Sequence, residues 1–168
     1  MRNLIFVLLA FLVSSSQSNC LAETSGSVSK EEKRMFQTSK ITLSSAEKQA
    51  VINKASKVKS ATSKEFYSLL TAWNNAIKSN PAMLISSDTK DYAKLPEFAK
   101  LKAMGKDIIP LIMKELLNEN NFYLLPLYDA IQDDSLQRVV LDTNSTEILG
   151  GEQYRAKKTI QLWLKKQP

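Results

Sequence analysis

Apolar side chains recur about once per helical turn along most of the chain. The clearest stripe has five large apolar residues at positions i, i+3, i+4, i+7 and i+11: Phe66, Leu69, Leu70, Trp73 and Ile77. This spacing places them on one face of an α-helix, so the pattern predicts a helix over residues 64–79. Asn80-Pro81 follows, and the helix should end there because a residue before proline disfavours helical backbone.

Similar patterns predict five further helices, over residues 45–59, 96–104, 108–118, 122–131 and 151–166. Residues 108–118 and 122–131 are apolar on most sides, so we expect these two helices at the centre of the domain. Residues 82–94 are predicted as a loop or short turn. Residues 133–145 leave two alternatives open, a short helix or a strand-like stretch.

Several residues mark the predicted helix boundaries. Ser44-Ser45-Ala46-Glu47 fits a capping box, with a hydroxyl at the N-cap and a carboxylate three residues on, and Thr62-Ser63-Lys64-Glu65 repeats the signal. Gly105 is a natural helix stop, and Asp107 can cap the next helix. Pro126 predicts a kink or a late start in the helix that contains it.

Together these patterns predict an all-α fold. The chain has only 4 Gly and 5 Pro in 168 residues, which favours long helices over many short strands. We predict a single α-helical domain over residues 44–168, built as a small helical bundle or a short stack of antiparallel helix pairs.

The first residues have the pattern of a secretory signal peptide. Arg2 precedes a ten-residue apolar run, Leu4 to Val13, and Cys20-Leu21-Ala22 has small residues at the −3 and −1 positions of a cut after Ala22. The run is too short for a bilayer, which needs roughly 20 residues. We therefore predict a signal peptide over residues 1–22, a polar, flexible lead-in over residues 23–43, and a secreted or periplasmic product with no transmembrane segment.

Cys20 allows a second interpretation, as the lipid-modified cysteine of a bacterial lipoprotein. The residues before it are Gln17-Ser18-Asn19. That pattern requires an aliphatic residue at −3 and a small residue at −1, so we do not expect a lipid anchor.

The chain contains no histidine, and Cys20 in the predicted leader is its only cysteine. This composition excludes Ser-His-Asp and Cys-His nucleophile systems and histidine-ligated metals. It also leaves the predicted mature domain without thiolate ligands or disulfides. No glycine-rich phosphate loop is present. The sequence therefore predicts no metal site and no cofactor.

Charge is unevenly distributed along the chain. Lys and Arg outnumber Asp and Glu by nine to four in residues 30–65 and by five to one in residues 151–168, whereas residues 86–142 have seven bases and ten acids. Basic faces of this kind suit an anionic envelope polymer, an acidic phospholipid or an acidic protein, or they simply keep solvated helices soluble. Nucleic acid is not expected, because Lys greatly outnumbers Arg in a chain predicted to be exported. The candidate binding residues on these faces are Lys54, Lys57, Lys157 and Lys158.

Tyr92 is a further candidate binding residue. It follows Asp91 and precedes Leu95-Pro96, so its ring can line a groove. The alternative is a loop aromatic folded over the core.

Carboxylates are the remaining groups for general acid–base chemistry, and Glu97 and Glu115 are weak catalytic candidates. Two carboxyl groups about 5–9.5 Å apart can hydrolyse a glycosidic bond when the surroundings separate their pKa values. The alternative places Glu97 in a first helical turn, where the dipole favours an acid, and Glu115 on a solvated helix side.

Part of the chain resembles a known group of proteins. Ser87 to Phe98, Met104-Gly105-Lys106 and Ile109-Pro110-Leu111-Ile112 look like a pattern in short exported bacterial proteins of unknown function. Their helical hairpins resemble HEAT-type repeats. The resemblance covers roughly residues 64–132 and implies a helical-hairpin fold, but it carries no catalytic residues to transfer.

These observations favour an exported, non-catalytic binding module of the cell envelope, of which an inhibitor or immunity-type protein is one form. The alternative is a carboxylate-dependent cell-wall glycoside hydrolase. A purely structural envelope protein is a third hypothesis. The binding module predicts a groove without paired catalytic carboxylates, and the hydrolase predicts two acids that face each other in a cleft.

Overall fold

The computed structural model describes residues 41–86, 88–142, 144 and 146–166. The predicted signal peptide and most of the predicted lead-in lie outside these residues. Leu43, the last residue of the predicted lead-in, is buried in the hydrophobic core. None of the helices in the described ranges has the length and apolar content needed to cross a bilayer.

Every regular element in the described ranges is helical, which confirms the predicted all-α fold. The α-helices are α2 (Ser45–Ala55), α3 (Ser60–Ser79), α4 (Pro81–Leu84), α5 (Pro96–Ala103), α6 (Ile109–Glu115), α7 (Leu125–Ile131) and α8 (Gly151–Lys166). Short 3-10 helices connect them: η1 (Thr89–Lys94), η2 (Gly105–Ile108), η3 (Glu119–Leu124), η4 (Ser135–Gln137) and η5 (Thr146–Gly150).

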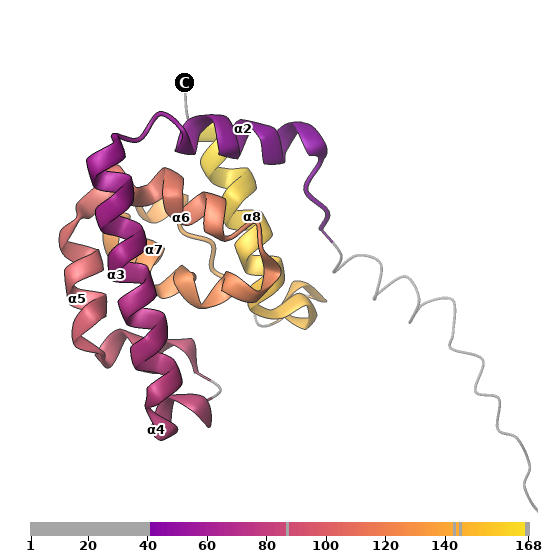
Figure 1. Ribbon diagram of the computed structural model, residues 1–168. Helices are drawn as coiled ribbons and strands as arrows, with labels where there is room; N and C mark the ends of the chain where they lie inside the picture. Colours follow the sequence, from indigo (N-terminus) through magenta and orange to yellow (C-terminus); the bar gives the residue numbers. More distant parts are fainter. Residues whose placement is uncertain (1–40, 87, 143, 145, 167–168) are drawn as a thin grey trace, which may run out of the picture.

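The helices form a small bundle with the two most apolar helices inside. Figure 1 shows α6 and α7 between α3 and α5 on one side and α8 on the other, with α2 across one end. α3 packs along α5, and α2 packs on both α6 and α8. Because α6 and α7 are surrounded by other helices, they bury side chains on most of their faces, as their sequences predict.

Trp73 is the centre of an aromatic cluster in this core. Its side chain is fully buried, and its Nε1 donates to the carbonyl oxygen of Tyr92 at 3.0 Å. The rings of Phe98 and Tyr123 lie with their centroids 5.6 Å from that of Trp73. The hydrogen bond satisfies the indole N–H, so burial of the large ring stabilises the packing of α3 against α5 without leaving an unpaired donor.

Two predicted boundary signals are confirmed. Ser44 and Glu47 form the capping box: the Ser44 N–H donates to Glu47 Oε2 at 2.7 Å, and the Glu47 N–H donates to Ser44 Oγ at 3.2 Å. Pro126 lies in the first turn of α7, which begins only at Leu125, because the preceding residues form the 3-10 helix η3. Proline is tolerated there, since a first-turn N–H has no partner within the helix.

Other predicted boundaries were wrong. α2 ends at Ala55, and α3 already begins at Ser60, so Thr62–Glu65 lies within its first turns and caps nothing. Asp107 is exposed within η2, and α6 starts two residues later at Ile109. Gly105 has φ +69°, a left-handed conformation that only glycine adopts easily, and the chain turns there directly into η2.

Candidate functional site

Two of the predicted binding lysines form ion pairs within the molecule. On α8, Lys157 Nζ lies 2.6 Å from Glu119 Oε1, and Lys158 Nζ bonds to Glu147 Oε1. Both acids lie earlier in the chain, Glu119 in η3 and Glu147 in η5. Much of the positive charge of α8 is therefore neutralised by these earlier acids. The prediction that Lys157 and Lys158 bind an anionic partner stays untested.

The other two predicted lysines lie on α2 and just after its end. Lys54 Nζ lies 5.9 Å from the centroid of the Trp163 ring, within range of a cation–π interaction between α2 and α8. Lys57 is exposed after the end of α2. Both remain candidates for an anionic partner.

Tyr92 combines the two roles that its sequence position allows. Its ring is half-buried against the core and lies edge-on to Tyr123, with centroids 6.4 Å apart. It also lines a small pocket of about 260 Å³ together with Asn74, Lys78 and Asn121.

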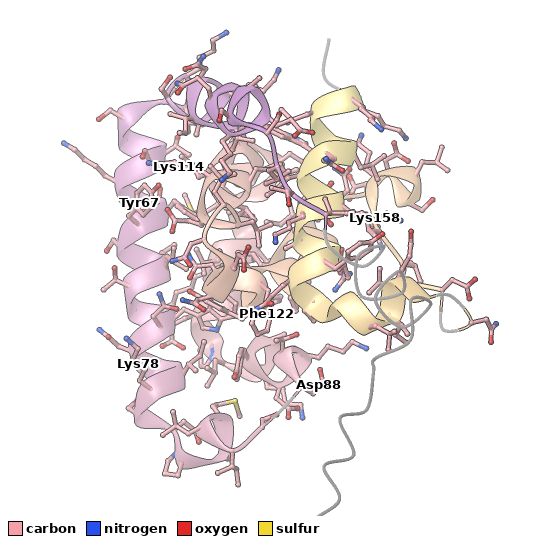
Figure 2. All side chains as sticks on the ribbon, turned by 90° about the vertical axis from the view of Figure 1, so that its right-hand side faces the viewer. Tyr67, Lys78, Asp88, Lys114, Phe122 and Lys158 are labelled. Atoms are coloured by element: carbon pink, nitrogen blue, oxygen red, sulfur yellow. The ribbon has the colours of Figure 1, made fainter. Side chains whose placement is uncertain are left out.

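Glu115 lies next to this pocket. The Asn121 side-chain amide donates to the Glu115 carboxylate at 3.2 Å and to its backbone carbonyl at 3.1 Å. Figure 2 shows Lys114 beside Tyr67 of α3, and the lysine Nζ is 5.5 Å from the centroid of that ring. Of the predicted candidates, the structure thus brings Tyr92 and Glu115 to one pocket: Tyr92 lines it, and Glu115 bonds to Asn121, which also lines it.

Glu97 has different surroundings from Glu115. It lies in the first turn of α5, which packs on α3 and α7, whereas Glu115 ends α6, which packs on α2. One carboxylate oxygen of Glu97 is buried and accepts no hydrogen bond within the described residues. Among the described residues, no hydrogen bond or ion pair connects Glu97 with Glu115.

A larger groove lies between α7 and α8, with a volume of about 730 Å³. Figure 2 labels Phe122 and Asp88, which line it from η3 and from the residue before η1. We name it the Arg155 groove after its most buried charged residue. Its other lining residues are Thr89, Lys90, Pro126, Asp129, Val139, Val140, Leu141, Ile148, Glu152 and Arg155.

Arg155 organises the polar part of this groove. Its side chain is only 17% exposed, and its guanidinium bonds to Asp129 of α7 and, at 2.8 Å, to Glu152 of the same helix. Its Nε donates to the Val139 carbonyl at 2.9 Å. One side chain therefore links α7, α8 and residue 139, and its planar fork of donors suits several acceptors at once.

Burial raises the pKa of the Asp129 carboxyl above its ordinary value, although the Arg155 guanidinium opposes the shift. Desolvation disfavours the charged form of any carboxylate, and the adjacent cation only partly restores it. A half-buried acid and a second carboxylate, Glu152, thus share one guanidinium, and this pair of acids lies at positions other than Glu97 and Glu115.

The residues after η4 form an extended segment along the groove. Arg138 has φ −96° and ψ 131°, and exposure alternates from Arg138 to Asp142 in the manner of a strand. Large apolar side chains around this segment are left in solvent: Val140 is 89% exposed, Leu136 73%, Leu149 65% and Ile148 42%. Val140 and Ile148 line the groove and form its apolar rim, and exposed apolar clusters of this kind are typical of interaction surfaces.

Sequence reasoning missed Asp129, Glu152 and Arg155 as a unit. Asp129 is the only charged residue in residues 122–131, so a single acid on an otherwise apolar helix was an available signal. Glu152 and Arg155 are three apart on a helix, a spacing at which opposite charges meet. The contact from α7 to α8 spans 26 residues, and no local pattern predicts it.

Comparison with known proteins does not extend these findings. No family model, curated protein or solved structure matches the chain. The resemblance to exported proteins with HEAT-like hairpins therefore stays a prediction. Within the described ranges, no three acidic, histidine or cysteine side chains are grouped so that they can hold a metal ion.

Proposed function

We propose that this chain is an exported, non-catalytic binding module of the cell envelope, and that it holds a partner protein in the Arg155 groove. The observation that carries the proposal is a groove of about 730 Å³ with apolar walls, an exposed apolar rim and a centre of fixed ion pairs. Export itself rests on the sequence of residues 1–22. An inhibitor or immunity-type role is one form of this function.

The arrangement of charges supports binding over catalysis. A general acid must present its proton to the leaving group, and a nucleophile or base must be free to reach the substrate. In the Arg155 groove, one guanidinium bonds to both Asp129 and Glu152, so each acid already has a cationic partner. Apolar side chains around a few fixed polar groups are typical of a binding site.

Capture of a partner from envelope extracts tests the proposal. The comparison uses the full chain and two variants, Val140→Lys at the rim of the groove and Leu84→Lys on α4. Both residues are exposed, at 89% and 62%, so neither substitution disturbs the core. We expect the wild type and Leu84→Lys to retain the same protein and Val140→Lys to lose it. Equal capture by all three contradicts the proposal.

The glycoside hydrolase remains the second candidate, because two carboxylates share the groove and burial raises the pKa of Asp129. It predicts that the protein clears a gel containing peptidoglycan. Clearing that is lost in Asp129→Asn or Glu152→Gln would assign the reaction to this groove, whereas loss in Glu97→Gln or Glu115→Gln would assign it to the residues predicted from sequence. An unchanged gel with the wild type removes this alternative.

A further inference from the structure

The extended segment of residues 138–142 has backbone groups available for pairing. Within the described part of the chain, the N–H and C=O groups of Val140 and Leu141 make no hydrogen bond. Leu141 is half-buried beside the groove and Val140 points into solvent. Unpaired backbone on an extended segment is a template for another strand, because each added strand satisfies these groups.

We propose that this edge takes up an extended segment of the partner protein by β-strand addition, and that the segment carries alternating apolar and basic side chains. The inference rests on the proposed function, since it specifies how the partner enters the Arg155 groove. In this mode of recognition, backbone hydrogen bonds supply affinity, and pockets for alternate side chains supply specificity.

Side-chain hydrogen bonds hold the edge in its extended form. Arg155 Nε fixes the Val139 carbonyl at 2.9 Å, and Arg138 Nε donates to the Gln132 carbonyl at 2.8 Å. The Tyr128 hydroxyl donates to the Gln137 carbonyl at 2.9 Å. A segment that is already ordered loses little conformational entropy when a partner pairs with it.

Charge decides the kind of side chain that the incoming segment carries. The groove is lined by three acids and two bases, Asp88, Asp129, Glu152, Lys90 and Arg155, a net charge of −1 in a chain whose net charge is +6. Asp88 has no ion pair among the described residues, whereas Arg155 is already bound to two acids. Lys90 likewise has no ion pair among the described residues, but the acids of the groove outnumber its bases by one, so the groove favours a basic side chain over an acidic segment or an anionic polymer.

The apolar walls of the groove account for the apolar side chains of the incoming segment. Phe122, Pro126 and Leu141 line the groove, and Val140 and Ile148 extend its apolar surface to the rim. Since side chains of a strand point alternately to opposite faces, an added strand can pack its apolar residues against these walls and leave its basic residues at the solvent-exposed part of the groove, where Asp88 is exposed. A helix in the groove would leave the Val140 and Leu141 backbone groups unpaired.

Three synthetic nonapeptides test this mode against the full chain by fluorescence anisotropy. The first alternates valine and lysine, and the second alternates valine and glutamate. The third is the first peptide with alternate backbone amides N-methylated, which removes the donors for strand pairing and keeps the charge. We expect saturable binding of the first peptide and at least tenfold weaker binding of the other two. The Val140→Lys variant should bind the first peptide at least tenfold more weakly, and Leu84→Lys should bind it as the wild type does.

Two outcomes overturn the inference: no saturable binding of the valine–lysine peptide, or equal affinity for its N-methylated form. Displacement of the captured envelope protein separates this failure from failure of the proposed function. If capture depends on Val140 but the valine–lysine peptide does not displace the partner, the groove binds in another mode. If no capture depends on Val140, the proposed function itself is wrong.

Discussion

The described parts of residues 60–131 and of residues 132–150 are held in place by different interactions. In the first region, buried apolar side chains hold the helices together, with Phe66, Leu70 and Trp73 of α3 packed into the core. In the second region, hydrogen bonds between side chains and backbone groups hold the chain in place. Gln132 is buried, accepts from the Asp134 N–H at 3.1 Å, and has its own carbonyl bonded to Arg138.

This difference explains why the candidate binding edge, residues 138–142, lies in the second region. A helix satisfies its own backbone, so packing needs only a stripe of apolar residues. Residues 138–142 are extended. Arg155 bonds to the Val139 carbonyl, and the side chain of Arg138 bonds back to the Gln132 carbonyl, so both hold the segment in place. The result is an ordered segment that still exposes backbone groups and apolar side chains. Local order without internal pairing is what a binding edge requires.

The largest effect is expected from the apolar region. Trp73→Ala should lower the free energy of unfolding by about 3–5 kcal/mol, because it removes a fully buried ring and leaves a cavity. Urea unfolding followed by circular dichroism measures the loss. Leu84→Ala is the control, since Leu84 is 62% exposed and its truncation should change stability by no more than about 0.5 kcal/mol. Equal losses in the two variants would contradict the assignment of Trp73 to the core.

An intermediate effect is expected from the polar region. Arg155→Met keeps much of the side-chain length but leaves the half-buried Asp129 without its cation, and should cost about 2–3 kcal/mol. The same variant should release residues 138–142, seen as lower backbone order parameters in NMR relaxation. Lys165→Met is the matched control, because Lys165 is exposed in the last turn of the same helix. Unchanged order at residues 138–142 in Arg155→Met would show that Arg155 does not hold the segment.

The smallest effect is expected on the pH dependence of stability, from Glu47 in the capping box of α2. The hydrogen bonds from Ser44 hold the pKa of the Glu47 carboxyl below its ordinary value of 4.5. A carboxylate with a lowered folded-state pKa stabilises the fold above its unfolded-state pKa, and this contribution is lost as pH falls through the folded-state pKa. Glu47→Gln should therefore be less stable than the wild type at pH 7, and the difference should vanish in acid. Urea unfolding at pH 7 and pH 3 checks this, and a difference that grows in acid would reverse the assigned sign.

Much of the helical region could be predicted from sequence because its signals are local. The Phe66–Ile77 stripe identified α3, the Ser44–Glu47 pair identified the start of α2, and α8 has the bounds predicted for it. The wrong predictions concern helix boundaries, where a capping-type sequence can also occur inside a helix. Thr62–Glu65 has the composition of a capping box, but it lies inside α3, which already begins at Ser60.

The sequence by itself determined that the chain is helical, which faces are buried and which chemistry is excluded, because each depends on residue type and on spacing within a few turns. Only the tertiary structure decided which charges meet. Arg155 bonds to Asp129, 26 positions earlier in the chain, and to Val139, 16 positions earlier. Lys157 and Lys158 form ion pairs with Glu119 and Glu147. Such contacts depend on how α7, α8 and the chain between them are placed in space, and no periodicity along the sequence records that placement.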